Sequence, residues 1–234
     1  MMEFGVIFTE SLAAIKKNII IIAPTVIASL IMLIVTSIVL GSDLATIDEK
    51  NFDKTILAIA PRLFAISAFN YFLQVFSHCT TIAMAIDIVN KGTCNFFDSC
   101  LTVLTKINTI VPASFLILIL LTFGLILLIL PALIVCFVFI LTFIIIMNED
   151  INPLWAMQKS YRTMKDNFSS SVVMFFFLLS VGITVNIINL LFGQMHYIGV
   201  VFSLFLSGVF MAFAALTLLK YYMTIEARRQ PVEL

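Results

Sequence analysis

Charged residues are scarce in this chain, which has 13 Lys and Arg and 13 Asp and Glu among its 234 residues, or 11%. A soluble domain usually carries about 25%. Hydrophobic residues make up 62% of the chain, and no water-soluble fold of this length could cover so much apolar surface. The lack of charge therefore excludes a soluble protein and predicts an integral membrane protein. The two signs of charge cancel, so net charge identifies no partner, and we expect no nucleic-acid partner.

The chain also lacks the motifs that carry enzyme chemistry. It has no HExxH, no GxSxG, no phosphate-binding loop and no paired carboxylates. Of its four cysteines, Cys94 and Cys100 are six residues apart without a second Cys or His pair, which argues against a zinc site. We therefore expect reduced structural thiols, no catalytic residue, no metal, no cofactor and no enzymatic activity.

Long apolar runs are what the sequence does have. From Thr109 to Met147 it contains 39 residues without a charge, interrupted by Pro131. This is about twice the ~20 residues that one membrane-spanning helix needs, so we predict two helices joined by a tight turn near Pro131. The whole chain, residues 1–234, is predicted to be one all-α membrane domain with six spans: Ile19–Leu40, Leu63–Ile86, Thr109–Leu130, Pro131–Met147, Ser169–Leu191 and Ile198–Tyr222.

The distribution of Lys and Arg predicts the orientation of this six-helix bundle. Ten of the 13 fall on one side of the predicted spans, and three, Lys50, Lys54 and Arg62, fall on the other. Because short cytoplasmic loops are enriched in Lys and Arg, both termini are predicted to be cytoplasmic. The run Ile19–Leu40 exceeds a signal-peptide core of roughly 7–15 residues, so we expect it to remain as an anchor.

Three short cytoplasmic segments resemble one another and end at Asn18, Asn108 and Asn167. Each has a serine near its start and a lysine near its end. Spacings of three and four predict amphipathic helices that lie in the membrane interface. Their predicted apolar stripes are Phe4, Phe8, Ser11 and Ile15; Phe97, Cys100, Leu104 and Ile107; and Leu154, Met157, Tyr161, Met164 and Phe168. The cations predicted to contact anionic lipid headgroups are Lys16, Lys17, Lys106, Lys159, Arg162 and Lys165.

These segments suggest a 2+2+2 repeat of an interfacial helix, an outgoing span and a returning span. The three units would be residues 1–90, 91–147 and 148–234. The alternative is that any six-span protein shows some basic cytoplasmic segments, and three short matches do not decide between the two interpretations.

The strings ILPALIV and NEDINPLWAMQKSYRTMKDNF, from Ile129 to Phe168, resemble the YciC-like family of proteobacterial inner-membrane proteins. That family is similar to the membrane domain attached to some glycerophosphodiester phosphodiesterases. The matching positions are Pro131, Glu149 or Asp150, Ala156, Ser160 and Asn167, and the resemblance extends from about Asn95 to Arg229. It implies a multi-pass bacterial inner-membrane protein, with a role in envelope or lipid homeostasis and no catalytic residues.

Polar residues inside the predicted spans are the best candidates for a functional site, because they are costly in hydrocarbon. The second span carries Ser67, Asn70, Gln74 and His78 on one face, and the fifth carries Asn186 and Asn189. At ~1.5 Å per residue, both stripes reach similar depths, so they could meet. They could serve only as hydrogen-bonding contacts between helices, or they could line a polar cavity.

Two functions remain open. The first is a structural or accessory membrane protein that binds membrane lipids, with a possible membrane-protein partner. The alternative is a transporter or binding protein for a lipid or small molecule, with a polar cavity between the second and fifth spans. A cavity between those two spans would favour the alternative.

Overall fold

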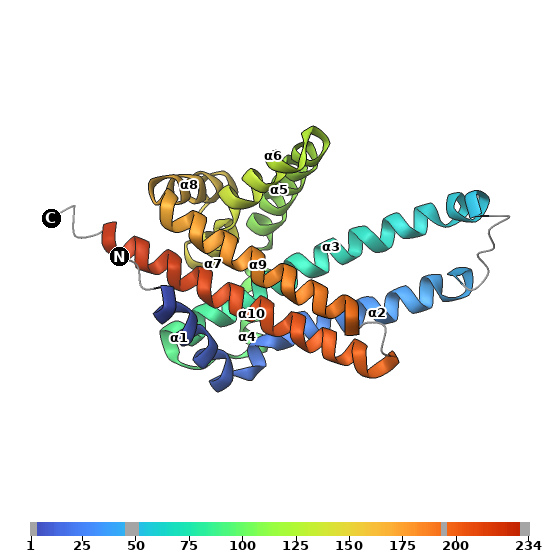
Figure 1. The fold of residues 1–234 in the computed structure, drawn as a ribbon, viewed down its shortest axis with the longest axis horizontal. Helices are drawn as coiled ribbons and strands as arrows, with labels where there is room; N and C mark the ends of the chain where they lie inside the picture. Colours follow the sequence, from blue (N-terminus) through green and yellow to red (C-terminus); the bar gives the residue numbers. More distant parts are fainter. Residues whose placement is uncertain (1–3, 45–51, 193–195, 230–234) are drawn as a thin grey trace.

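The computed structural model describes residues 4–44, 52–192 and 196–229, and these are helical apart from short connections, with no strand among them (Figure 1). Lys50, one of the three predicted outer cations, lies outside the described residues. Among the described residues, six helical segments are long and apolar enough to cross a membrane, which confirms the predicted number of spans. They cover Ile19–Leu40, Ile59–Lys91, Ile107–Leu127, Ile129–Asn148, Phe168–Phe192 and Ile198–Arg228.

The three short segments are helical, as predicted: α1 (Phe4–Lys17), α4 (Phe96–Thr105) and α8 (Pro153–Asp166). Local sequence accounts for where two of them begin. The side chains of Asn95 and Asn152 accept hydrogen bonds from the backbone N–H groups of Phe97 and Leu154, at 3.0 and 3.1 Å. Each bond satisfies an N–H that the helix leaves without a partner. Pro153 occupies the first turn of α8, where its missing N–H costs nothing.

The turn of the central hairpin is at Leu128, between α5 (Ile107–Leu127) and α6 (Ile129–Phe139). The turn predicted near Pro131 therefore lies three residues earlier in the chain. Proline is tolerated in the first turn of a helix, and Pro131 lies there, just inside α6. The hairpin is closely packed, since a Cβ atom added to Gly124 would lie 2.9 Å from the Cα atom of Ala132.

The fourth span bends, because α6 ends at Phe139 and α7 covers Thr142–Asn148. No Pro or Gly lies near this break. Instead, the Ser160 hydroxyl of α8 donates a 2.7 Å hydrogen bond to the Val138 carbonyl, just before the break. A side chain that inserts into a helical hydrogen-bond ladder is a recognised cause of kinks, so α8 explains the bend in its neighbour.

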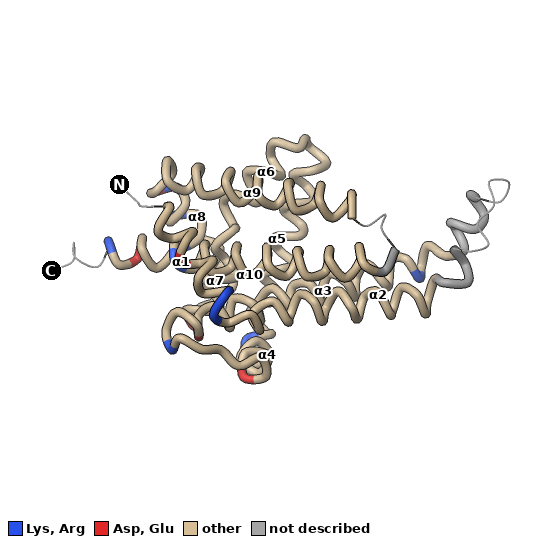
Figure 2. The backbone as a smooth tube through the Cα atoms, turned by 60° about the horizontal axis from the view of Figure 1, so that its bottom comes forward, with Lys and Arg blue, Asp and Glu red and all other residues tan. Residues whose placement is uncertain are grey.

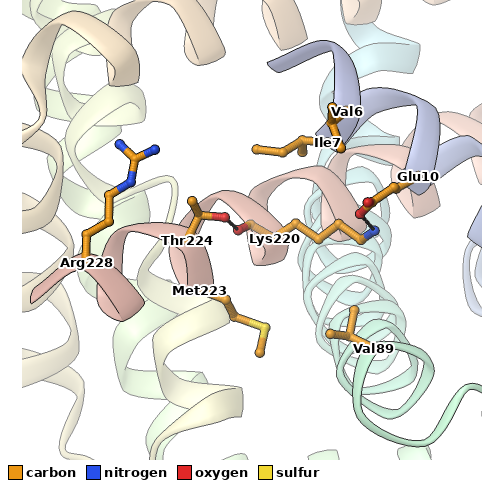
Figure 3. A pocket seen from close by; sticks show the side chains of 8 residues that line it. All are labelled: Val6, Ile7, Glu10, Val89, Lys220, Met223, Thr224 and Arg228. Atoms are coloured by element: carbon orange, nitrogen blue, oxygen red, sulfur yellow. Dashed lines mark hydrogen bonds and ion pairs between the residues drawn. The ribbon is translucent and has the colours of Figure 1, made fainter. Parts of the chain in front are cut away.

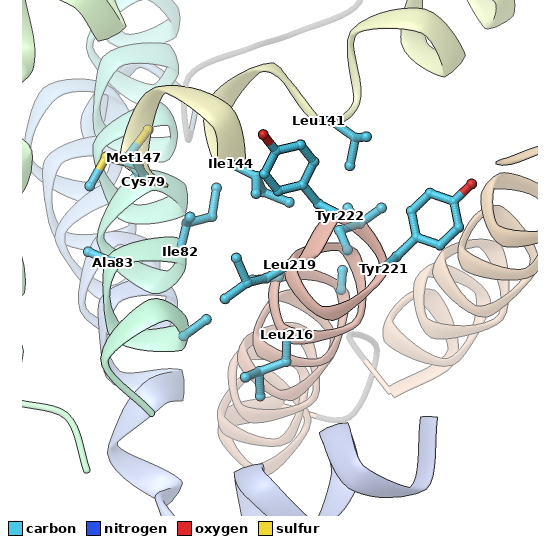
Figure 4. Close-up of a cluster of buried hydrophobic side chains, with 14 of the residues drawn as sticks. Cys79, Ile82, Ala83, Leu141, Ile144, Met147, Leu216, Leu219, Tyr221 and Tyr222 are labelled. Atoms are coloured by element: carbon cyan, nitrogen blue, oxygen red, sulfur yellow. The ribbon is translucent and has the colours of Figure 1, made fainter. Parts of the chain in front are cut away.

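The core lies where three returning helices meet: α3 (Phe52–Lys91), α7 and α10 (His196–Arg229) (Figure 4). Successive residues there are buried on all sides, which is why these segments show no simple amphipathic pattern. The largest fully buried side chains include Ile82 and Met84 of α3, Ile144, Ile145 and Ile146 of α7, and Leu216, Tyr221 and Tyr222 of α10. The outgoing helices, α2 (Ala23–Leu44), α5 and α9 (Phe168–Phe192), surround this core.

Each short helix precedes one outgoing–returning pair in the chain but packs on the returning helix of a different pair. The contacts are α4 on α3, α8 on α7, and α1 on α10. Each short helix also buries one serine, Ser11, Ser99 or Ser160, at 0%, 1% and 0% exposure. In α8 the packed face comprises Ala156, Met157, Ser160, Thr163 and Met164. The predicted stripe of α8 is therefore only partly buried, because Leu154, Tyr161 and Phe168 are exposed.

Most charged residues of the described chain gather at one end of the molecule, which we call the charged end (Figure 2). The α2, α3, α9 and α10 helices run along a common direction from it, whereas the α5–α6 hairpin points away from them (Figure 1, Figure 2).

Candidate functional site

The polar stripe of α3 lies beside α5 and α7. Asn70, Gln74 and His78 are half-buried and Ser67 is exposed. The His78 ring packs edge-on against Phe143, with 6.0 Å between ring centroids. Tyr71, next to Asn70, donates a 2.6 Å hydrogen bond to the carbonyl of Ser114 on α5. These contacts are those of helix packing.

The polar stripe of α9 lies beside α10. The Asn189 side-chain amide donates to the Ser207 hydroxyl on α10 at 2.9 Å, whereas Asn186 bonds back to the Gly182 carbonyl of its own helix at 2.8 Å. Within the described residues no hydrogen bond joins the two stripes, and α10 packs against both α3 and α9. The structure therefore does not bring Asn70 and Asn186 together, because a helix that sequence periodicity could not place lies between them.

The six predicted headgroup cations divide into two groups. Lys16, Lys17, Arg162 and Lys165 are exposed. Lys106 and Lys159 instead have partners within the protein. The Lys106 ammonium donates to the Ile146 and Met147 carbonyls at 3.1 and 3.2 Å, where it satisfies the last turn of α7.

Lys159 lies at the centre of a half-buried cluster that joins α8 to the ends of two returning helices. Its Nζ is 2.7 Å from Glu149 Oε1 and 3.0 Å from Glu226 Oε1. The Tyr222 hydroxyl donates to Glu149, and Lys159 Nζ lies 5.6 Å from the centroid of the Tyr222 ring. Burial by itself lowers the pKa of Lys159, but the hydrogen bonds with Glu149, Tyr222 and Glu226 outweigh it and raise that pKa.

A cavity of about 380 Å³ adjoins this cluster. It is lined by Glu149, Ile151, Trp155, Gln158, Lys159 and Arg162. Trp155, the only tryptophan of the chain, is 63% exposed. The cavity therefore combines two cations, one carboxylate that is already paired, and an aromatic ring at its edge.

A second cavity, of about 430 Å³, lies where α1 meets α10 and α3 (Figure 3). Lys220 Nζ and Glu10 Oε2 form a 2.6 Å ion pair on one side of it, and Arg228 stands apart from that pair. Val6, Ile7, Val89 and Met223 provide apolar walls.

Sequence reasoning identified Lys159 and Arg162 but did not predict the partners of Lys159. The available signal was the position of Glu149 and Glu226 at the ends of spans, since acids there need partners. Their pairing could not be predicted because Lys159 and Glu226 are 67 residues apart. Within the described residues, no group of three His, Cys, Asp or Glu side chains is arranged to hold a metal.

Comparison of the chain with protein-family models, curated proteins and solved structures finds no match.

Proposed function

We propose that this chain is a non-enzymatic inner-membrane protein with its charged end at the cytoplasmic face. Its short helices α4 and α8 lie in the membrane interface, and the cations of α8 bind anionic phospholipid headgroups. The role is structural or accessory, in envelope or lipid homeostasis, and it does not require a transport path. The alternative of a polar transport cavity between α3 and α9 stays a prediction.

The two-sided character of α4 and α8 carries the proposal. One side of each helix packs on a returning helix, and the other side exposes large apolar groups to the surroundings. In α4 the exposed groups are Phe97, Leu101 and Leu104, and in α8 they are Leu154, Trp155 and Tyr161. Exposed apolar side chains on a helix that also carries cations are typical of helices in the headgroup plane. In α8, Arg162 and Lys165 provide those cations, whereas α4 contains no Lys or Arg.

A recurring charge contact supports the 2+2+2 interpretation with units 1–90, 91–147 and 148–234. A charged residue directly precedes each buried serine: Glu10, Asp98 and Lys159. In α1 and α8 this residue pairs with an opposite charge on, or directly after, the returning helix on which its own helix packs. Glu10 pairs with Lys220 and Lys159 with Glu149, whereas Lys91, at the end of α3, pairs with Asp87 of its own helix. We infer that the three short helices occupy equivalent positions, which would place all three in the same plane.

Tryptophan fluorescence tests the interfacial position of α8, because Trp155 is the only tryptophan. The protein is reconstituted into bilayers of phosphatidylcholine, with and without phosphatidylglycerol. We expect blue-shifted emission, quenching by lipids brominated near the headgroup end of the acyl chain, and a larger shift with phosphatidylglycerol. Full quenching by aqueous iodide together with no effect of brominated lipid would contradict the proposal.

A further inference from the structure

We propose that the cavity beside α8 binds the phosphate of one anionic phospholipid headgroup, with Arg162 as the main contact. This inference rests on the proposed function, which brings the cavity to headgroup level. It goes further by assigning a single saturable site and a ligand class, whereas a basic surface would attract anionic lipids without a defined site.

The charges that line the cavity favour an anion. Glu149 is already bonded to Lys159 and to the Tyr222 hydroxyl, so it does not require another cation. Arg162 is exposed and has no ion pair within the described residues. Lys159 is paired with both Glu149 and Glu226, so these three groups and Arg162 are together neutral. Arg162 is the lining cation without an ionic partner, which the phosphate of a phosphodiester monoanion would supply. A guanidinium also offers two parallel donors to phosphate oxygens.

The position and size of the cavity favour a lipid over a soluble anion. Trp155 and Ile151 form its apolar part, and Leu154, next to Trp155, is 64% exposed. Trp is enriched at the headgroup level of membranes, and these apolar groups would contact the glycerol and the first part of an acyl chain. A volume of about 380 Å³ falls in the range of roughly 300–1,000 Å³ that small-molecule pockets occupy.

The cavity between α1 and α10 supplies a matched control. Arg228 is an exposed arginine that lines that cavity (Figure 3), so Arg228→Gln removes the same charge as Arg162→Gln from another part of the charged end. Lys165→Gln removes a neighbouring charge from α8 itself. Diffuse attraction would weaken to a similar extent in all three variants, whereas a defined site would respond mainly to Arg162.

The experiment titrates purified protein, in a non-ionic detergent, with short-chain phosphatidylglycerol, short-chain phosphatidylcholine or inorganic phosphate, and follows Trp155 emission. We expect saturation with phosphatidylglycerol and much weaker effects of the other two. Arg162→Gln should weaken binding about tenfold or more, and Arg228→Gln and Lys165→Gln by less than about threefold. Arg162→Lys keeps the charge but loses the two parallel donors of the guanidinium, so its affinity for phosphatidylglycerol should lie between those of wild type and Arg162→Gln.

Three results would overturn the site. Equal losses in the Arg162 and Arg228 variants would indicate diffuse attraction. Saturation by inorganic phosphate at the same concentrations as the lipid would indicate a soluble anion rather than a headgroup. If Trp155 is quenched by brominated lipid in bilayers but no saturable lipid binding occurs, the site fails while the interfacial position of α8 stands.

Discussion

At the residue scale, Lys159 shows how one side chain holds several helices together. It belongs to α8, and its two carboxylate partners lie just after α7 and on α10. Without the ammonium, two half-buried carboxylates would face each other, and removal of one member of a buried charge cluster is far more costly than loss of an exposed pair. Lys159 therefore contributes to the fold, although the sequence suggested that it faces lipid.

We expect Lys159→Gln to lower the free energy of unfolding by about 1–3 kcal/mol at neutral pH. Because its partners raise the pKa of Lys159, this stabilisation is fully present below the ordinary lysine pKa of about 10.4. It is lost as pH rises above that value, through the higher pKa of the folded state. The difference between wild type and variant should therefore stay constant from pH 7 to about pH 10 and shrink at higher pH.

The unfolding midpoint in detergent, recorded across this pH range, checks the expectation. Lys165→Gln is the control, since it removes an exposed lysine from the same helix and should change stability by less than about 0.5 kcal/mol. Equal midpoints for wild type and Lys159→Gln at pH 7 would contradict the structural role of the cluster.

At the element scale, the α5–α6 hairpin depends on Gly124, which lies directly against the backbone of Ala132. A Cβ atom at position 124 would meet Ala132 Cα and N at 2.9 Å, and backbone atoms cannot move aside as the end of a flexible side chain can. Gly124 is also buried, near the end of α5. The two helices can therefore approach this closely only because residue 124 has no side chain.

Gly124→Ala should destabilise the protein by about 1–3 kcal/mol, because the two helices must separate. Gly5→Ala is the matched control, since nothing lies within 4 Å of a Cβ atom at that position of α1. Alanine favours helix over glycine by about 1 kcal/mol, so the control should be neutral or stabilising. Thermal unfolding of the two purified variants separates these effects, and equal shifts in the same direction would refute the close contact.

The helices themselves could be predicted from the sequence, whereas the contacts between them could not. Apolar length indicated six spans, and Asn95 and Asn152 stand at the starts of short helices. No residue near Phe139 in the sequence predicts the helix break there, because the break depends on a hydrogen bond from Ser160, which lies in the following helix. The packed face of α8 was predicted only in part: Met157 and Met164 belong to it, whereas Ala156, Ser160 and Thr163, which allow close packing through small size, were missed because the prediction relied on large apolar residues.

The same limit applies to the candidate site. The depth of Asn70 and Asn186 in their spans followed from counting residues, but their neighbours depend on the order of helices around the core. Asn189 pairs with Ser207 on α10, the helix that also separates the two stripes. Hydropathy measures how deep a residue lies and contains no information about which helix it faces.

At the scale of the whole molecule, α1 and α10 close the arrangement of helices. The ion pair between Glu10 and Lys220 joins residues 210 positions apart. Phe8 supports it by stacking on Phe177 at 4.0 Å between ring centroids and by packing against Phe213. This contact ties the beginning of the described chain to the last helix.

Glu10→Lys should lower stability by about 1 kcal/mol, because it replaces an attraction by a repulsion at a partly exposed site. The double variant Glu10→Lys/Lys220→Glu restores an opposite pair and should recover most of the loss. Glu10→Lys/Lys17→Glu restores net charge but not the pair, so it should not recover. Unfolding midpoints at low and high salt test this, and the three variants would be indistinguishable if the contact contributed nothing.

The packing of α1 on α10 also has a consequence for biosynthesis. Ribosomes release α1 before every helix that follows it, yet the surface that covers Ile7, Ser11 and Ile15 is made last. The α4 and α8 helices follow α3 and α7 and can dock as soon as they emerge, whereas α1 must wait at the membrane until translation reaches α10. The earliest of the described helices to be made is thus the last to dock, and any pause late in translation prolongs the time for which a buried face of this protein stays uncovered.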